Sequence, residues 1–153
     1  TGTTFEENAL QKARFVFEKT GLPTLADDSG LEVDALGGAP GVYSKRYTPE
    51  AIASTNNAKL LREMKGVTVR SARFVCALGL VTASGESAWR GTVEGQIGLD
   101  LKGDNGFGYD PLFLPTLAPG RSMAELKPHE KDWISHRGQA LLKLKSKIAA
   151  LEA

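Results

Sequence analysis

Apolar residues recur at helical spacing in two stretches of the first half of the chain. The first stretch begins at a capping box, Thr4 with Glu7, and ends at Gly21; the second runs from Thr48 to Met64. This spacing predicts two amphipathic helices whose inward-facing side chains are Leu10, Ala13, Val16, Phe17, Ile52, Leu60, Leu61 and Met64.

Strand patterns occur on both sides of the second helix. The short apolar stretch Thr24–Ala26 predicts a buried strand, and the longer stretches Ser71–Thr82 and Ser87–Ile97 predict an antiparallel hairpin. Trp89 in this hairpin is interpreted as a packing residue. Residues 35–44 contain three glycines and a proline, so we expect a loop without regular structure there.

The end of the chain predicts one more amphipathic helix. The amphipathic pattern spans Gln139–Leu151. Ser135 is the expected N-cap of the segment that contains this pattern, so His136 and Arg137 are expected in the first helical turn. Basic residues at the positive end of a helix dipole are unusual, and they favour an anion or an electron-rich ligand docking there. The alternative is a local exception without function. The apolar side of the helix comprises Leu141, Leu144, Ile148 and Leu151.

Length and composition indicate one ordinary globular domain over residues 1–153, with 41% hydrophobic and 24% charged residues. The net charge of +1 predicts no general attraction to nucleic acid or to a membrane surface, and we expect neither as a partner. The single cysteine, Cys76, lies in an apolar run and is expected to be a buried, inert thiol of a cytoplasmic protein. Because the chain opens at Thr1 without a methionine, we expect an N-terminal truncation.

Two adjacent carboxylates, Asp27 and Asp28, come directly after the apolar pair Leu25 and Ala26 and directly before Ser29 and Gly30. Carboxylates at the end of a buried strand are costly to desolvate unless a partner compensates them. Mg²⁺ is such a partner, because it takes oxygen ligands and shares them with phosphate. Ser29 can donate to a phosphate oxygen. The alternative is a surface turn, since all four residues favour turns.

Two aromatic residues, Phe107 and Tyr109, stand among glycines in the segment 102–111. We expect this segment to be too flexible to bury them in a core, which favours a stacking platform for a planar ligand. The alternative is that Phe107 tucks under the loop as a hydrophobic anchor.

Five stretches occur together in the order and spacing of one known family: 3–9 (TTFEENA), 26–31 (ADDSGL), 36–44 (LGGAPGVYS), 105–113 (NGFGYDPLF) and 134–141 (ISHRGQAL). On these motifs the chain resembles the inosine triphosphate pyrophosphatase, or Ham1-like, family over nearly its whole length. The resemblance implies an α/β fold: an elongated, two-lobed molecule around a long mixed β-sheet, with flanking helices and a nucleotide cleft. It also implies a cytoplasmic, Mg²⁺-dependent, homodimeric enzyme that hydrolyses dITP, ITP and XTP to the monophosphate and pyrophosphate.

The resemblance assigns roles to individual residues. It makes Asp28 the catalytic base and a metal ligand, and Ser29 a substrate contact. The implied base-binding loop is Phe107, Gly108, Tyr109 and Asp110, and further implied substrate contacts are Lys131, His136, Arg137 and, at the phosphates, Lys12. One more cation is either Lys45 or Arg46. Glu7 is a tempting metal ligand, but the metal-binding glutamate of the family aligns just before Thr1.

One feature of the family has no match in this chain. Family members open with a strand and a T/S-x-N-x-x-K loop that grips the triphosphate, ahead of the capping box. Without that loop, a non-catalytic nucleotide-binding module is the rival function. The chemistry itself needs an activated water, a metal to neutralise the phosphates, and cations for the leaving pyrophosphate. Asp28, Ser29, Lys12 and Lys131 can supply the protein's share of these functions.

Overall fold

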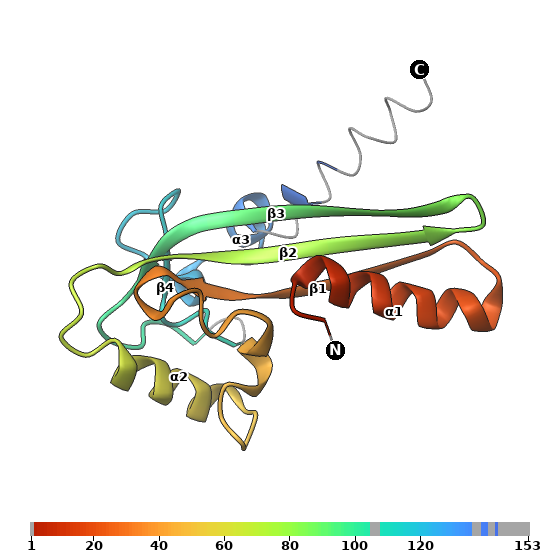
Figure 1. Ribbon diagram of the computed structural model, residues 1–153. Helices are drawn as coiled ribbons and strands as arrows, with labels where there is room; N and C mark the ends of the chain where they lie inside the picture. The colour runs from red at the N-terminus through yellow and green to blue at the C-terminus, as the bar shows by residue number, and fades with distance from the viewer. Residues whose placement is uncertain (1, 105–107, 136–138, 141–142, 144–153) are drawn as a thin grey trace. The chain divides into compact units, whose positions relative to one another are not determined.

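The computed structural model (Figure 1) describes residues 2–104, 108–135, 139–140 and 143. The chain divides into two compact units. The first unit comprises Thr1–Ser29, Val75–Thr92 and His136–Ala153, and the second unit comprises Gly30–Phe74 and Val93–Ser135.

Four strands form one sheet in the order β1-β2-β3-β4. The sequence prediction is confirmed for β2, and β3 begins two residues earlier than predicted because only Ala83 and Ser84 form the turn between them. Strand β4 pairs antiparallel with β3, and Ile97 lies opposite Phe113. The α/β fold is confirmed; its described sheet is antiparallel, not mixed. The strands are β1 (Thr24–Val33), β2 (Ser71–Thr82), β3 (Gly85–Ile97) and β4 (Phe113–Pro115).

Strand β1 is longer than predicted, and the Asp-Asp-Ser-Gly stretch lies inside it. The expectation of a strand that stops at Ala26, and the alternative of a surface turn, are both wrong. The strand continues because its later backbone groups find partners in the second unit. The Leu31 N–H donates to Ser44 Oγ at 2.8 Å, and the Val33 N–H donates to the Ala39 carbonyl at 3.0 Å. Satisfied backbone groups outweigh the turn preference of short polar residues.

In the first unit, helix α1 (Phe5–Thr20) has the predicted ends. Thr4 accepts the Glu7 N–H, and Gly21 adopts a left-handed conformation at the C-terminus. The Glu7 carboxylate completes the cap by accepting from the Thr3 N–H at 2.9 Å, one residue earlier than a capping box requires. The predicted buried face is partly wrong: Val16 is exposed. Ala13 is buried as predicted, and Phe5 and Ala9 are buried in addition.

Small residues let α1 pack directly on β2. A Cβ atom added at Gly79 would lie 2.8 Å from the Leu10 nitrogen and 2.9 Å from the Ala9 carbonyl carbon, both backbone atoms of α1. Helix and strand can keep this close approach only if position 79 has no side chain. The face of α1 is therefore chosen by backbone contact with β2 more than by the size of its apolar side chains.

The first prediction follows from this contact. We expect Gly79→Ala to push α1 away from β2 and to lower the free energy of unfolding by ~1–3 kcal/mol, as overpacking does. Thermal and urea unfolding measure the loss, and Ser87→Ala, at an exposed β3 position, is the control. An unchanged melting temperature for Gly79→Ala would show that the helix shifts at no cost.

In the second unit, helix α2 (Ala53–Glu63) begins later than predicted. Ala51 has a φ of 53°, which interrupts the helix, and the backbone turns helical only after Ile52. Thr48 instead donates from its N–H and its hydroxyl to Asn56 Oδ1, at 2.9 and 2.8 Å. As a result, Ile52 is exposed and not buried as predicted.

The glycine-rich stretch before α2 is more regular than expected. It contains two short 3₁₀-helices, η1 (Asp34–Leu36) and η2 (Gly41–Arg46), so the expectation of a loop without regular structure is wrong. The Ser44 hydroxyl fixes η2 to β1, because it accepts from the Leu31 N–H and donates to the Gly41 carbonyl at 2.7 Å.

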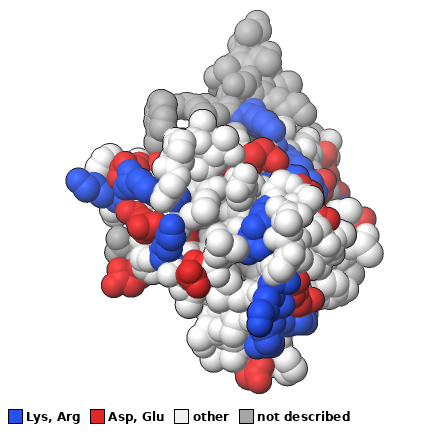
Figure 2. Space-filling model, turned by 90° about the vertical axis from the view of Figure 1, so that its left-hand side faces the viewer, with Lys and Arg blue, Asp and Glu red and all other residues white. Residues whose placement is uncertain are grey.

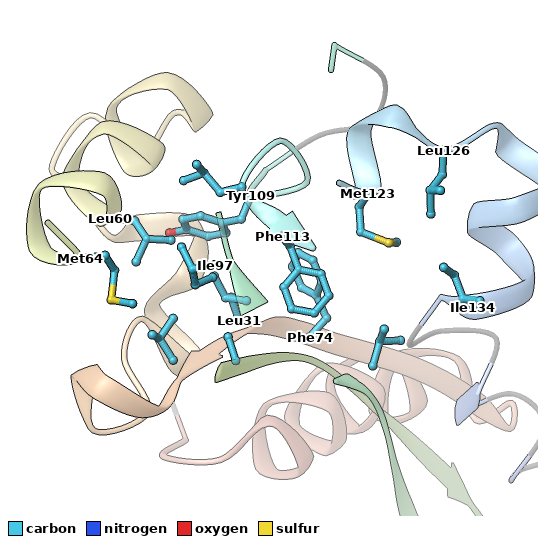
Figure 3. Close-up of a cluster of buried hydrophobic side chains, with 14 residues drawn as sticks. Leu31, Leu60, Met64, Phe74, Ile97, Tyr109, Phe113, Met123, Leu126 and Ile134 are labelled. Carbon is cyan, nitrogen blue, oxygen red and sulfur yellow. The ribbon is translucent and has the colours of Figure 1, made fainter. Parts of the chain in front are cut away.

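The core of the second unit lies between its strands, α2 and the last short helices (Figure 3). Phe74 and Phe113 meet edge to face, with ring centroids 4.5 Å apart. Two short helices close the unit, η3 (Met123–Glu125) and α3 (Pro128–Ile134). The buried set is Leu31, Val33, Leu60, Met64, Ala72, Phe74, Val93, Ile97, Tyr109, Leu112, Phe113, Met123, Leu126 and Ile134.

The sequence did not predict α3, and Ser135 caps the C-terminus of α3 where an N-cap was expected. Most of the predicted tail helix, including its four apolar positions, lies outside the described residues. Cys76 is fully buried, as predicted, and Trp89 packs against its cluster, which confirms the interpretation of Trp89 as a packing residue.

No helix among the described residues is long and apolar enough to cross a membrane. On the face shown in Figure 2, basic and acidic side chains are interspersed.

Candidate active site

The catalytic candidate, Asp28, lies on β1, and two side chains of α1 hold its carboxylate. Asn8 Nδ2 donates to Asp28 Oδ2 at 3.2 Å, and Lys12 Nζ donates to Asp28 Oδ1 at 3.3 Å. Asn8 and Lys12 are four residues apart and therefore lie on one face of the helix. Each carboxylate oxygen accepts one of these hydrogen bonds and still has a lone pair that can bind a ligand.

Burial and charge make this carboxylate distinctive. Only 15% of the Asp28 side chain is exposed, whereas Lys12 is 53% exposed. Lys12 also donates to the Asp27 carbonyl at 3.0 Å, which fixes its ammonium group against β1. The structure thus brings the predicted base and the predicted phosphate contact into direct hydrogen bonding.

Sequence reasoning missed Asn8. Its Oδ1 accepts from the Gly2 N–H at 2.7 Å, so the amide is fixed on one side while it donates to Asp28 on the other. The signal that could have found it is the spacing with Lys12, which places two donors one turn apart on a helix that packs near the acid.

Asp27 and Ser29 stand on either side of Asp28 in β1. Successive side chains of a strand point to opposite faces, so the strand geometry separates both from Asp28. The role of Ser29 as a substrate contact stays a prediction.

The described residues contain no group of three or more His, Cys, Asp and Glu side chains that could hold a metal. Mg²⁺ does not require such a group, since it commonly takes one or two carboxylates together with waters and substrate phosphates. The oxygens of Asp28 are the donor type that suits it. Glu7 is engaged in capping α1 through the Thr3 N–H.

In the second unit, the predicted base-binding loop is anchored at three consecutive residues. The Gly108 carbonyl accepts from Asn57 Nδ2 at 2.9 Å, and the Tyr109 hydroxyl donates to the Ser44 carbonyl at 2.7 Å. Asp110 is 5% exposed and forms an ion pair with Lys131, so two predicted substrate residues contact each other. These contacts hold residues 108–110 in place before any ligand binds.

The expectation that Tyr109 stays out of the core is wrong. Its side chain is 5% exposed and lies beside Leu60 and Ile97 in the core of the second unit (Figure 3). Burial, with the nearby Glu63 charge, raises the pKa of the Tyr109 phenol well above its ordinary value, so it remains a donor to Ser44. Its ring is therefore unavailable for stacking, and stacking by Phe107 stays a prediction.

Three predicted contacts, Phe107, His136 and Arg137, lie outside the described residues, and their roles stay predictions. Lys45 and Arg46 are both exposed on η2, and the Arg46 guanidinium lies 5.6 Å from the centre of the Tyr43 ring. Geometry therefore does not choose between these two cations.

Comparison with known proteins identifies the family. The model of the Ham1 family matches residues 1–147 of this chain.

The chain belongs to the Ham1 family.

Its relatives in the Ham1 family include the dITP/XTP pyrophosphatase of Exiguobacterium sp., which is 58% identical over 151 residues, covering 97% of this chain and 76% of the relative. The dITP/XTP pyrophosphatase of Mycolicibacterium paratuberculosis is 52% identical over 155 residues, covering 99% and 74%. Among solved structures, the Staphylococcus aureus Ham1 protein has a TM-score of 0.92 at 40% identity, covering 98% of this chain and 79% of that protein. A Ham1 protein from Coxiella burnetii has a TM-score of 0.89 at 44% identity, covering 98% and 79%.

Proposed function

We propose that this protein hydrolyses dITP, ITP and XTP to the nucleoside monophosphate and pyrophosphate, and so removes nucleotides with deaminated purines from the nucleotide pool. Membership of the Ham1 family and relatives named dITP/XTP pyrophosphatase support the reaction. The observation that carries it is the shielded Asp28 carboxylate, held by Asn8 and Lys12.

In this proposal, Asp28 orients the attacking water and accepts its proton. Attack on a phosphoanhydride builds negative charge on the phosphate oxygens, and the Lys12 ammonium lies where it can offset that charge. Ser29 is the proposed donor to a phosphate oxygen. Lys131, paired with Asp110, is a further proposed substrate contact, together with the 108–110 backbone.

Mg²⁺ is the proposed metal, and Asp28 the residue of this chain that binds it. When bound, Mg²⁺ neutralises charge on the phosphates. Lys12 would compete with the metal for one oxygen of Asp28, so we expect the ammonium to turn toward the phosphates when both are present. We further propose a cytoplasmic homodimer, as the resemblance to the family implies.

The deciding experiment measures pyrophosphate release from ITP, dITP and XTP by the purified protein, with and without Mg²⁺, and with ATP as the comparison substrate. We expect release from the three deaminated nucleotides only when Mg²⁺ is present, and much less from ATP. Calorimetric binding of ITP without any release of pyrophosphate would instead favour the non-catalytic nucleotide-binding module.

A further inference from the structure

Helix α2 presents two neighbouring asparagines that are equally buried but very differently bonded. Asn56 and Asn57 are each 5% exposed. The Asn56 amide is saturated: Oδ1 accepts from the Thr48 N–H and hydroxyl, and Nδ2 donates to the carbonyls of Ser44 and Lys45. Asn56 therefore fastens α2 to η2, and this accounts for its burial.

The Asn57 side chain makes a single hydrogen bond among the described residues. Its Nδ2 donates to the Gly108 carbonyl at 2.9 Å, across 51 positions of sequence. Its Oδ1 is buried and accepts from no donor in the part of the chain that the structure describes. A buried acceptor without a partner costs about as much as an ordinary hydrogen bond contributes. The Asn57 amide therefore adds little to the stability of the fold.

What Asn57 does accomplish is to fix the backbone of the predicted base-binding loop. Gly108 has a φ of 60° and is only partly buried. Because glycine has no Cβ, its backbone can change from this conformation to others at little cost. Asn57 holds this flexible residue by its carbonyl, directly before the anchored Tyr109 and Asp110. When a loop loses such a hydrogen bond, the conformation that binds the ligand becomes one of several. The apparent affinity for the ligand then falls in proportion to the fraction of molecules in that conformation.

We propose that Asn57 is a positioning residue for purine binding, which preorganises the 108–110 backbone from α2. This inference rests on the proposed function, because it takes residues 108–110 as a contact of the base. Asn57 acts through Gly108 and not on the nucleotide itself. Its loss therefore weakens binding of every purine nucleotide and leaves the chemistry at Asp28 unchanged.

The test compares Asn57→Leu and Asn57→Ala with the matched control Asn56→Leu. We expect both Asn57 variants to raise KM for ITP roughly tenfold, the equivalent of one lost hydrogen bond, and to change kcat by less than about twofold. Calorimetric affinity for IMP should fall by the same factor as KM rises. Their melting temperatures should stay near that of the wild type, whereas Asn56→Leu should melt clearly lower.

A purely structural role predicts the opposite pattern, in which the melting temperature of the Asn57 variants falls and KM does not change. That result, or unchanged IMP affinity in both variants, overturns the proposal. If the wild type binds IMP but does not hydrolyse ITP, the proposed function fails while IMP affinity still tests Asn57. A wild type that neither hydrolyses ITP nor binds IMP overturns both.

Discussion

Asp28→Asn is expected to lower turnover of ITP by at least ~10², the usual contribution of a general base, while the protein stays folded. The substitution preserves the volume of the side chain but removes the charge proposed to bind a metal and the basicity proposed to activate water. An amide oxygen can still accept from Asn8 or Lys12, so the contact between β1 and α1 survives in part. Steady-state pyrophosphate release at saturating Mg²⁺, together with thermal unfolding, measures the two effects separately.

Asp27→Asn is the matched control for this prediction, because it makes the same chemical change one position earlier in β1. Alternation along the strand directs Asp27 away from the face that α1 covers, so its substitution should lower turnover less than Asp28→Asn does. Wild-type turnover by Asp28→Asn, or an equal loss from the two variants, would contradict the assignment of Asp28 as the base.

Arg137→Ala is expected to collapse the preference for ITP over ATP, by lowering kcat/KM for ITP on the order of 10²-fold and for ATP very little. Hypoxanthine and xanthine carry a carbonyl at position six of the purine, where adenine carries an amino group. A guanidinium only donates hydrogen bonds, so the predicted contact from Arg137 would pair with this carbonyl and would face another donor when adenine binds. A buried donor without a partner costs ~1–3 kcal/mol, and more when it is charged.

Phe107→Ala is the comparison variant. Stacking uses the face of the base, which every purine offers alike, so this change should weaken ITP and ATP in similar proportion. The measurement is kcat/KM for both nucleotides in both variants. An unchanged ITP-to-ATP ratio in Arg137→Ala would mean that another residue reads the carbonyl. Guanine shares that carbonyl, so this contact discriminates against adenine alone.

Several elements could be predicted from the sequence because their signals are local and strong. The bounds of β2 follow from a long apolar run closed by turn residues, and the ends of α1 follow from Thr4 and Gly21. The five motifs that occur in order, including those around Asp28 and Asp110, were sufficient to predict the Ham1 family, which the family match confirms. Signals of this kind depend on residue type and spacing along the chain, and they need no knowledge of the neighbours in space.

The predictions that failed depend on distant partners. Asp27 and Asp28 prefer turns, yet they lie in a strand because the strand goes on to backbone partners at Ala39 and Ser44. Turn propensities are local preferences of single residues, whereas leaving a buried backbone group unpaired costs ~1–3 kcal/mol. The burial of Tyr109 has a similar explanation. Burying an aromatic ring stabilises the fold by more than the cost of ordering the flexible glycines beside it.

The sequence by itself determined that α1, α2 and the β2–β3 hairpin exist, the family, and the residues capable of the chemistry. Only the tertiary structure decided which of these residues meet: Asn8 and Lys12 on Asp28, Lys131 on Asp110, and Asn57 on Gly108. The physical reason is that hydrogen bonds and ion pairs act over about 3 Å of space, whatever the separation along the chain. Asn56 and Asn57 are adjacent and chemically identical, and only their partners distinguish an anchor of the fold from the residue proposed to position the loop.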